Sequence, residues 1–267
     1  MKPVQPLFRR LSHAFAAALG TVAFSAAGLA LASEAANRPL DVPYVPTPQA
    51  VVDRMLEIAK VDAGDYVIDL GSGDGRIPVT AASRYGARAL GVDLNPERIA
   101  EANENAVQAG VTDKVEFRKQ DLFKTEFRDA TVVTMYLLPN VNLKLRPRLL
   151  DELRPGTLVV SHAFDMQDWE PDQREIVEGR SVMLWIIPAK VDGVWQVAGS
   201  DPFVLELEQN FQRLEGAAIR GDQRIEISDG RIRGDQITFT IDGNTYRGRI
   251  GNEAISGDDG TWHALRG

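Results

Sequence analysis

A regular pattern of apolar and polar positions begins after a proline-rich stretch, DVPYVPTP, at residues 41–48. Three prolines in eight residues predict an extended arm, which we place at residues 33–47. Beyond the arm, apolar side chains recur every three or four residues, at Val51, Val52, Met55, Leu56 and Ala59. This spacing predicts a helix over residues 48–60, with Thr47 as its N-cap and Pro48 at its first helical position.

From residue 66 to residue 164, short apolar runs alternate with segments of helical spacing. The apolar runs predict strands at residues 66–70, 89–94, 114–120, 130–137 and 157–164. The other segments predict helices at residues 75–85, 96–109 and 147–153. Buried strands that alternate with helices are typical of a doubly wound α/β sheet. We therefore expect residues 48–200 to form one α/β domain.

Helical spacing stops after residue 171. Two apolar runs, residues 181–189 and 193–199, predict strands joined as a hairpin through Asp192 and Gly193. From about residue 210, short alternating runs are separated by DGR, RGD, DGN and GDDG. These turns predict a small C-terminal β-meander over residues 210–267. Their aspartates lack the spacing of a calcium-binding loop.

A glycine-rich loop, VIDLGSGDGR at residues 67–76, lies between a predicted strand and a predicted helix. Gly71, Gly73 and Gly75 allow a sharp turn and a close approach of the backbone to a ligand. The helix that follows presents free backbone amides at its first turn. The loop therefore predicts a nucleotide-type ligand at this end of the strand.

Two features of the loop distinguish between cofactors. The third glycine comes one position earlier than in the dinucleotide fingerprint, and Asp69 and Asp74 flank the turn. These carboxylates would repel a pyrophosphate, which disfavours a nicotinamide-dependent oxidoreductase. S-adenosylmethionine carries an ammonium and a sulfonium and no phosphate, so the acids favour it electrostatically.

Two further acids follow the next predicted strands. Asp93 ends the second strand, where its carboxylate can accept hydrogen bonds from both ribose hydroxyls. Asp121 follows the third strand and is placed to meet an adenine amino group, although either acid could instead be a helix cap or a solvated loop residue. The predicted cofactor-binding residues are Asp69, Gly71, Ser72, Gly73, Asp74, Gly75, Asp93, Leu94, Asp121 and Leu122.

The motifs PYVPTP, VIDLGSGDGRI, GVDLNP, KQDLF and LRPGTLVVSHAF occur in this order. The glycine loop with Asp93 and Asp121 resembles the class I S-adenosylmethionine-dependent methyltransferases. Over about residues 43–170 the chain more closely resembles the mitochondrial protein-lysine methyltransferases and their bacterial relatives. The meander after residue 210 is not part of that family's core.

The resemblance implies a Rossmann-like, seven-stranded methyltransferase sheet whose final strand is antiparallel, consistent with a hairpin at residues 181–198. It also implies a methyl acceptor, either a protein lysine or another amine. Tyr44 in the PYVP motif would close over the cofactor or tether the arm to the core.

Ligands bind beyond the carboxyl ends of the strands in open α/β sheets. This rule places Tyr136, Pro139, Asn140 and His162 near the transferred methyl group. Tyr136, Asn140 and His162 are the catalytic candidates, with His162 as a possible general base. The alternatives are a core aromatic for Tyr136, a helix N-cap for Asn140 and a core or loop histidine for His162. With three histidines spread along the chain and no cysteine, the sequence predicts no metal site.

The chain of 267 residues carries a formal net charge of −8, which makes a nucleic-acid substrate unfavourable. Residues 1–32 read as a signal peptide, with a cationic start, an apolar run and a small-x-small cleavage signal before Ser33. We therefore expect a periplasmic or secreted protein. The alternatives are an uncleaved membrane anchor and an exported, non-catalytic binding module that keeps the methyltransferase fold. The sequence does not predict an oligomeric state.

Overall fold

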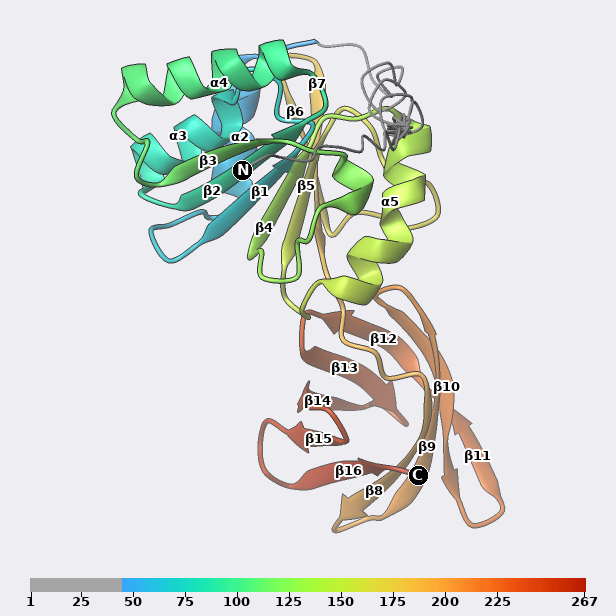
Figure 1. The fold of residues 1–267 in the computed structure, drawn as a ribbon. Coiled ribbons are helices and arrows are strands. Elements are labelled where there is room, and N and C mark those ends of the chain that lie inside the picture. The colour runs from blue at the N-terminus through green and yellow to red at the C-terminus, as the bar shows by residue number, and fades with distance from the viewer. Residues whose placement is uncertain (1–44) are drawn as a thin grey trace, which may run out of the picture. The chain divides into compact units, whose positions relative to one another are not determined.

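The computed structural model describes residues 45–267 of the chain (Figure 1). The predicted signal peptide, its cleavage site and Tyr44 lie outside the described residues. Residues 45–267 belong to one compact unit, which contains two β-sheets. Within the described residues, no helix is both long and apolar enough to cross a membrane.

The first sheet has seven strands in the order β3-β2-β1-β4-β5-β7-β6. Strands β1 to β5 pair in parallel, and β7 is antiparallel to both β5 and β6. The strands are β1 Tyr66–Leu70, β2 Arg88–Asp93, β3 Val115–Lys119, β4 Val132–Met135, β5 Leu158–His162, β6 Gln173–Val177 and β7 Arg180–Ile186. The predicted seven-stranded α/β sheet with a late antiparallel strand is confirmed.

Helices cover both faces of this sheet (Figure 1). They are α2 Gln49–Ile58, α3 Arg76–Tyr85, α4 Pro96–Ala109 and α5 Pro139–Glu152, and a short 3-10 helix, η1, spans Leu122–Lys124. Because side chains alternate along a strand, Val67 of β1 packs in the core with α2 and α3, whereas Ile68 packs in the core with α5. Each face is therefore closed by its own apolar core.

Two helix predictions need correction. Pro48, not Thr47, is the N-cap of α2, and the Thr47 side chain instead lies 3.1 Å from the Nδ1 atom of His162. Helix α5 begins at Pro139 and contains Pro147, which the sequence pattern had placed at the start of a short helix. Val141 and Leu145 lie in the first two turns of α5 at i,i+4 spacing. This spacing could have predicted that the helix begins before Pro147.

The predicted hairpin between residues 181 and 199 is wrong. Strand β7 pairs with β5 and β6, so the antiparallel hairpin of the first sheet is β6–β7, which turns at Glu178 and Gly179. Strand β8, Gly193–Gly199, instead pairs with β9 and β16 in the second sheet. Strand β6 was missed because most of its positions face solvent and carry polar side chains.

The second sheet is antiparallel and closes on itself. Its strands follow the order β11-β10-β12-β13-β14-β15-β16-β8-β9, and β9 also pairs with β10. They are β8 Gly193–Gly199, β9 Phe203–Asn210, β10 Arg213–Arg220, β11 Gln223–Glu226, β12 Ser228–Arg233, β13 Gln236–Ile241, β14 Asn244–Ile250, β15 Ala254–Gly257 and β16 Trp262–Arg266. Its core includes Trp195, Phe239 and Trp262. The predicted meander is present, and β8 and β9 extend it to residue 193.

Candidate active site

The glycine loop makes the turn that the sequence predicts. Gly71, Gly73 and Gly75 have φ values of 81°, 53° and 76°, a region that residues with a Cβ rarely adopt. A Cβ on Gly71 would lie 2.8 Å from the Leu137 side chain, and a Cβ on Gly75 would lie 2.4 Å from the Phe117 ring. Glycine is therefore required at both positions by backbone conformation and by packing.

Asp93, at the end of β2, holds this loop in place. Its Oδ2 accepts a hydrogen bond of 3.0 Å from the Gly73 backbone N–H, and its Oδ1 accepts one of 2.8 Å from the Asn95 backbone N–H. Each carboxylate oxygen has a second lone pair, so the side chain can still accept from ribose hydroxyls. Asp93 thus links the loop to the position predicted for the ribose.

Asp69, at the end of β1, is buried, with 2% of its surface exposed. Its Oδ1 accepts a 2.7 Å hydrogen bond from the Thr134 hydroxyl. Burial, helped by the negative charges of Asp74 and Asp93, raises the pKa of Asp69 to about 7, although the Thr134 hydrogen bond acts in the opposite direction. A cationic ligand group beside Asp69 would favour its ionised form.

Arg76 joins the glycine loop to the arm that precedes α2. Its guanidinium forms an ion pair of 2.5 Å with Asp74 and donates a 2.8 Å hydrogen bond to the Thr47 carbonyl. Asn105 of α4 donates a 2.9 Å bond to the Asp74 carbonyl. The sequence analysis assigned no role to Arg76, although its position two residues after Asp74 was a usable signal.

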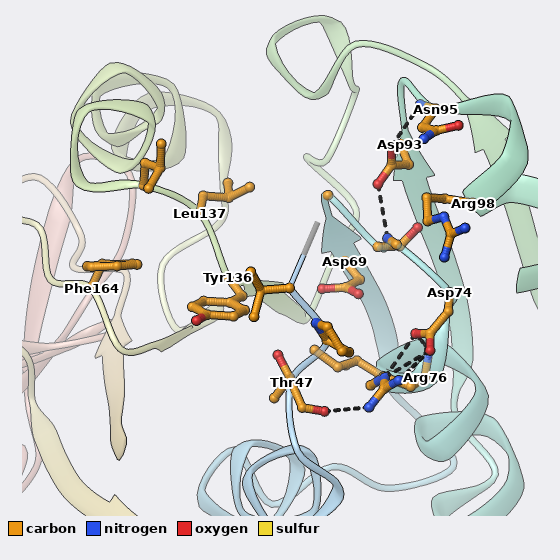
Figure 2. Close-up of a pocket in the computed structure, with 17 residues that line it drawn as sticks. Thr47, Asp69, Asp74, Arg76, Asp93, Asn95, Arg98, Tyr136, Leu137 and Phe164 are labelled. Carbon is orange, nitrogen blue, oxygen red and sulfur yellow. Dashed lines mark hydrogen bonds and ion pairs between the residues drawn. The ribbon is translucent and has the colours of Figure 1, made fainter. Parts of the chain in front are cut away.

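These residues line one cavity, at the carboxyl ends of β1, β2 and β4 (Figure 2). Its described lining comprises Val45, Pro46, Thr47, Asp69, Gly71, Ser72, Gly73, Asp74, Arg76, Ile77, Asp93, Asn95, Arg98, Tyr136, Leu137, Leu138 and Phe164. The polar side, with Asp74, Asp93 and Arg98, lies opposite the side formed by Tyr136, Leu137 and Phe164, and Asp69 lies between them (Figure 2).

Four predicted cofactor residues are not among those that line the cavity: Gly75, Leu94, Asp121 and Leu122. The Asp121 side chain caps η1 by accepting a 2.9 Å bond from the Phe123 backbone N–H. Its predicted contact with adenine stays a prediction. Conversely, the sequence analysis named no function for Asn95, Arg98 or Phe164, although each follows the end of a strand closely.

The three catalytic candidates lie in different environments in the structure. Tyr136 lines the cavity, and its ring lies 3.9 Å from the His162 ring and 6.1 Å from the Phe164 ring, centroid to centroid. His162 is buried beneath Tyr136, and its Nε2 has no hydrogen-bond partner among the described residues. Asn140 is exposed in the first turn of α5, where Leu138 and not Asn140 is the N-cap.

His162 is uncharged near neutral pH. Burial, together with the positive charge of Arg180, lowers its pKa to about 4. Its Nδ1 is engaged with Thr47 of the arm, so the imidazole connects the end of β5 to the residues that cover the cavity. This geometry suits a residue that positions Tyr136 and the arm.

Replacing Asp69 by Asn should stabilise the ligand-free protein and weaken cofactor binding. The folded state keeps a proton on Asp69 that the unfolded chain has released, so the free energy of unfolding falls as the pH rises from near 4 to about 7. At pH 8 the Asp69→Asn variant should unfold several degrees higher than the wild type, and the difference should shrink toward pH 4.

The measurement is thermal unfolding at several pH values, with calorimetric titration of S-adenosylmethionine alongside. The affinity of the variant should fall about tenfold or more, because its cavity loses one negative charge. Asp113→Asn, at an exposed carboxylate, is the matched control and should change neither quantity. Equal unfolding temperatures for wild type and Asp69→Asn at pH 8 would show that Asp69 does not keep its proton in the folded protein.

Replacing Asp93 by Asn should weaken cofactor binding without unfolding the chain. Both carboxylate oxygens accept backbone N–H groups, whereas an amide side chain accepts at one oxygen and presents a donor at the other position. The glycine loop should therefore lose one anchor, and the dissociation constant for S-adenosylhomocysteine should rise at least about tenfold. An unchanged constant by calorimetry would show that Asp93 has no part in the site.

Comparison with known proteins places this site in a family. Residues 69–173 match the family model described as the ANTKMT methyltransferase domain. A protein-lysine N-methyltransferase of Saccharolobus islandicus is 50% identical over 151 residues, which cover 55% of this chain and 94% of that protein. The adenine nucleotide translocase lysine N-methyltransferase of Mus musculus is 36% identical over 168 residues, which cover 62% of this chain and 67% of that protein.

A solved structure agrees with these matches. The crystal structure of an RNA methyltransferase from Salinibacter ruber in complex with S-adenosylhomocysteine is 55% identical, with a TM-score of 0.54 over 55% of this chain and 96% of that one. The buried carboxylate and the glycine turn fit the cationic, phosphate-free cofactor that the sequence predicts. None of these matches supports the non-catalytic alternative. The chain belongs to the ANTKMT methyltransferase-domain family, and it is an S-adenosylmethionine-dependent methyltransferase.

Proposed function

We propose that this methyltransferase modifies the side-chain amine of a protein lysine. The observation that carries the proposal is the aromatic wall, which we define as Tyr136 and Phe164, on the side of the cavity opposite Asp74 and Asp93 (Figure 2). Aromatic rings attract ammonium groups, and an apolar wall accommodates the methylene stem of a lysine. The relatives from Saccharolobus islandicus and Mus musculus are both named lysine N-methyltransferases, which supports the same acceptor.

The reaction requires alignment more than acid–base chemistry. Bound S-adenosylmethionine supplies a methyl group on a positively charged sulfur. The lysine Nζ lone pair forms the new N–C bond, and the electron pair of the broken C–S bond stays on sulfur, which leaves a neutral thioether. The contribution of the protein is to hold the amine in line with that bond and to exclude water.

The amine must lose its proton before it can attack, because a free lysine has a pKa of about 10.4. Transfer from water to the aromatic wall lowers that pKa by desolvation, so the proton can leave to solvent as the amine enters. In this proposal Tyr136 contacts the amine. His162 keeps Tyr136 in place and is not itself the base, since its ring is buried and its Nδ1 is engaged with Thr47.

An RNA acceptor is the alternative, because the Salinibacter ruber structure is described as an RNA methyltransferase. The charge of this chain argues against it, since a protein with a net charge of −8 repels phosphate. The arginines at the cavity are also paired with acids, Arg76 with Asp74 and Arg98 with Glu101. We therefore favour the protein acceptor and include RNA in the test.

The acceptor can be identified with radiolabelled cofactor. The purified enzyme is incubated with S-[methyl-³H]adenosylmethionine and, separately, with the protein and the RNA of a host-cell lysate. Label should enter protein, survive ribonuclease and appear as methyllysine after hydrolysis. Phe164→Ala should slow this transfer about tenfold, because it removes a ring that faces the positive charge developing on the amine during transfer, and should leave cofactor affinity unchanged.

Ile176→Ala is the control for this experiment, because Ile176 is an exposed apolar side chain on β6 that does not line the cavity. It should transfer label at the wild-type rate. Label found in RNA alone would refute the lysine proposal. If Phe164→Ala transfers the methyl group at the wild-type rate, the Phe164 ring of the aromatic wall does not contribute to acceptor binding.

We also propose, from residues 1–32, that the protein is exported to the periplasm or secreted after cleavage before Ser33. The full-length chain should therefore be recovered in the periplasmic or external fraction of a bacterial host, with its N-terminus near Ser33 by sequencing. Recovery with membranes and an intact N-terminus would instead indicate that the segment is an anchor.

A further inference from the structure

Residues 163–172, which we call the acceptor-side segment, connect β5 to β6 and carry Phe164 of the aromatic wall. The segment contains neither helix nor strand, apart from an isolated bridge between Met166 and Trp169. Ala163 and Gln167 have φ values of 67° and 56°, so its backbone turns sharply twice. Other elements must therefore hold it in position.

Helix α5 and strand β5 hold the first half of this segment. The Asn142 amide donates to the carbonyls of Phe164 and Asp165 at 3.2 and 3.3 Å, and the Ser161 hydroxyl donates to the Phe164 carbonyl at 2.6 Å. Arg146 donates a 2.8 Å bond to the Met166 carbonyl. These contacts fix the backbone carbonyls of residues 164–166.

The second sheet holds the other half. At the turn between β9 and β10, the Phe211 ring stacks on the buried Trp169 ring, with 5.8 Å between centroids and 20° between planes. The next residue, Gln212, is buried and donates a 2.7 Å bond to the Glu170 carbonyl. Arg213 forms an ion pair with Glu170. The turn therefore contacts the acceptor-side segment with three successive residues.

Phe211 also contacts the helix that holds the first half. The Arg146 guanidinium lies 5.2 Å from the centroid of the Phe211 ring, within the range of a cation–π contact. Arg146 thus bonds to the Met166 carbonyl while its charge lies over Phe211. Arg146 therefore connects helix α5, which holds the first half of the segment, to the β9–β10 turn, which holds the second half.

The backbone of Phe211 is strained. Its φ is 53°, a left-handed conformation that is unfavourable for a bulky residue and that glycine adopts readily. A turn that served only to connect β9 and β10 would not need an aromatic residue there. The ring contacts with Trp169 and Arg146 give a physical reason for it.

We propose that the β9–β10 turn of the second sheet positions the acceptor wall: Phe211 and Gln212 hold residues 163–172, and through them Phe164, where the acceptor amine binds. This inference rests on the proposed function in that Phe164 is taken to contact the acceptor. The family match ends at residue 173, before the second sheet begins at Gly193, so this support is supplied from outside the matched region.

The test is hydrogen–deuterium exchange on the full-length enzyme, with variants at Phe211. Phe211→Gly removes the ring and accepts the same backbone conformation, so the turn should persist. Loss of one stacked aromatic pair should accelerate amide exchange over residues 163–172 about tenfold. Amide exchange in β1 to β3 should not change. Phe211→Tyr keeps the ring and should restore slow exchange.

Ile255→Val is the matched control, because Ile255 lies in the core of the second sheet and has no part in the β9–β10 turn. It should lower the unfolding temperature without accelerating exchange over residues 163–172. If Phe211→Gly leaves this exchange at the wild-type rate, or if Ile255→Val accelerates it equally, the positioning role is refuted.

The kinetic test uses labelled transfer to lysate protein at several protein concentrations. Phe211→Gly should raise the apparent KM for acceptor several-fold and leave calorimetric binding of S-adenosylhomocysteine unchanged. An unchanged acceptor KM together with accelerated exchange would show that the turn holds the segment without shaping the acceptor wall, and would overturn the proposal. If the wild type labels no protein, the lysine proposal fails, and the exchange measurement still decides the role of Phe211.

Discussion

The active site depends on bringing three carboxylates to one cavity. Asp69 and Asp93 lie near the ends of the paired strands β1 and β2, and the sharp turn of the glycine loop after β1 brings Asp74 to the same cavity. Their mutual repulsion and the burial of Asp69 raise the pKa of that group to about 7, so the site is costly to keep ionised without a ligand. A cofactor with an ammonium and a sulfonium offsets this cost, and a phosphate would add to it.

The arm before α2 is tied to both sides of this cavity. Arg76 connects it to the loop through the Thr47 carbonyl, and His162 connects it to β5 through the Thr47 hydroxyl. Thr47 thus contacts Arg76 of the glycine loop, on the cofactor side of the cavity, and His162, on the proposed acceptor side. This arrangement explains why a buried, neutral histidine lies next to the reaction site without a direct place in the proposed chemistry.

The second sheet has a core of its own and also contacts the first domain at the segment that carries Phe164. In the proposal, the first sheet supplies the cofactor site and the second sheet helps to shape the acceptor wall. A division of this kind separates what all S-adenosylmethionine-dependent enzymes need from what selects an acceptor.

The sequence by itself determined most helices and strands of the first sheet and the cofactor loop, although it missed β6 and the first two turns of α5. The spacing of apolar residues predicted α4 at residues 96–109, and the acids around three glycines indicated S-adenosylmethionine, because periodicity and local charge are properties of short segments. It could not determine partners distant along the chain. The continuous apolar run of β7 predicts a buried strand but not that β6 lies beside it, and Thr47 looks like a helix cap until His162 is brought within 3.1 Å. The tertiary structure alone decided that Phe211 meets Trp169, since contacts between residues far apart in sequence depend on how whole elements pack.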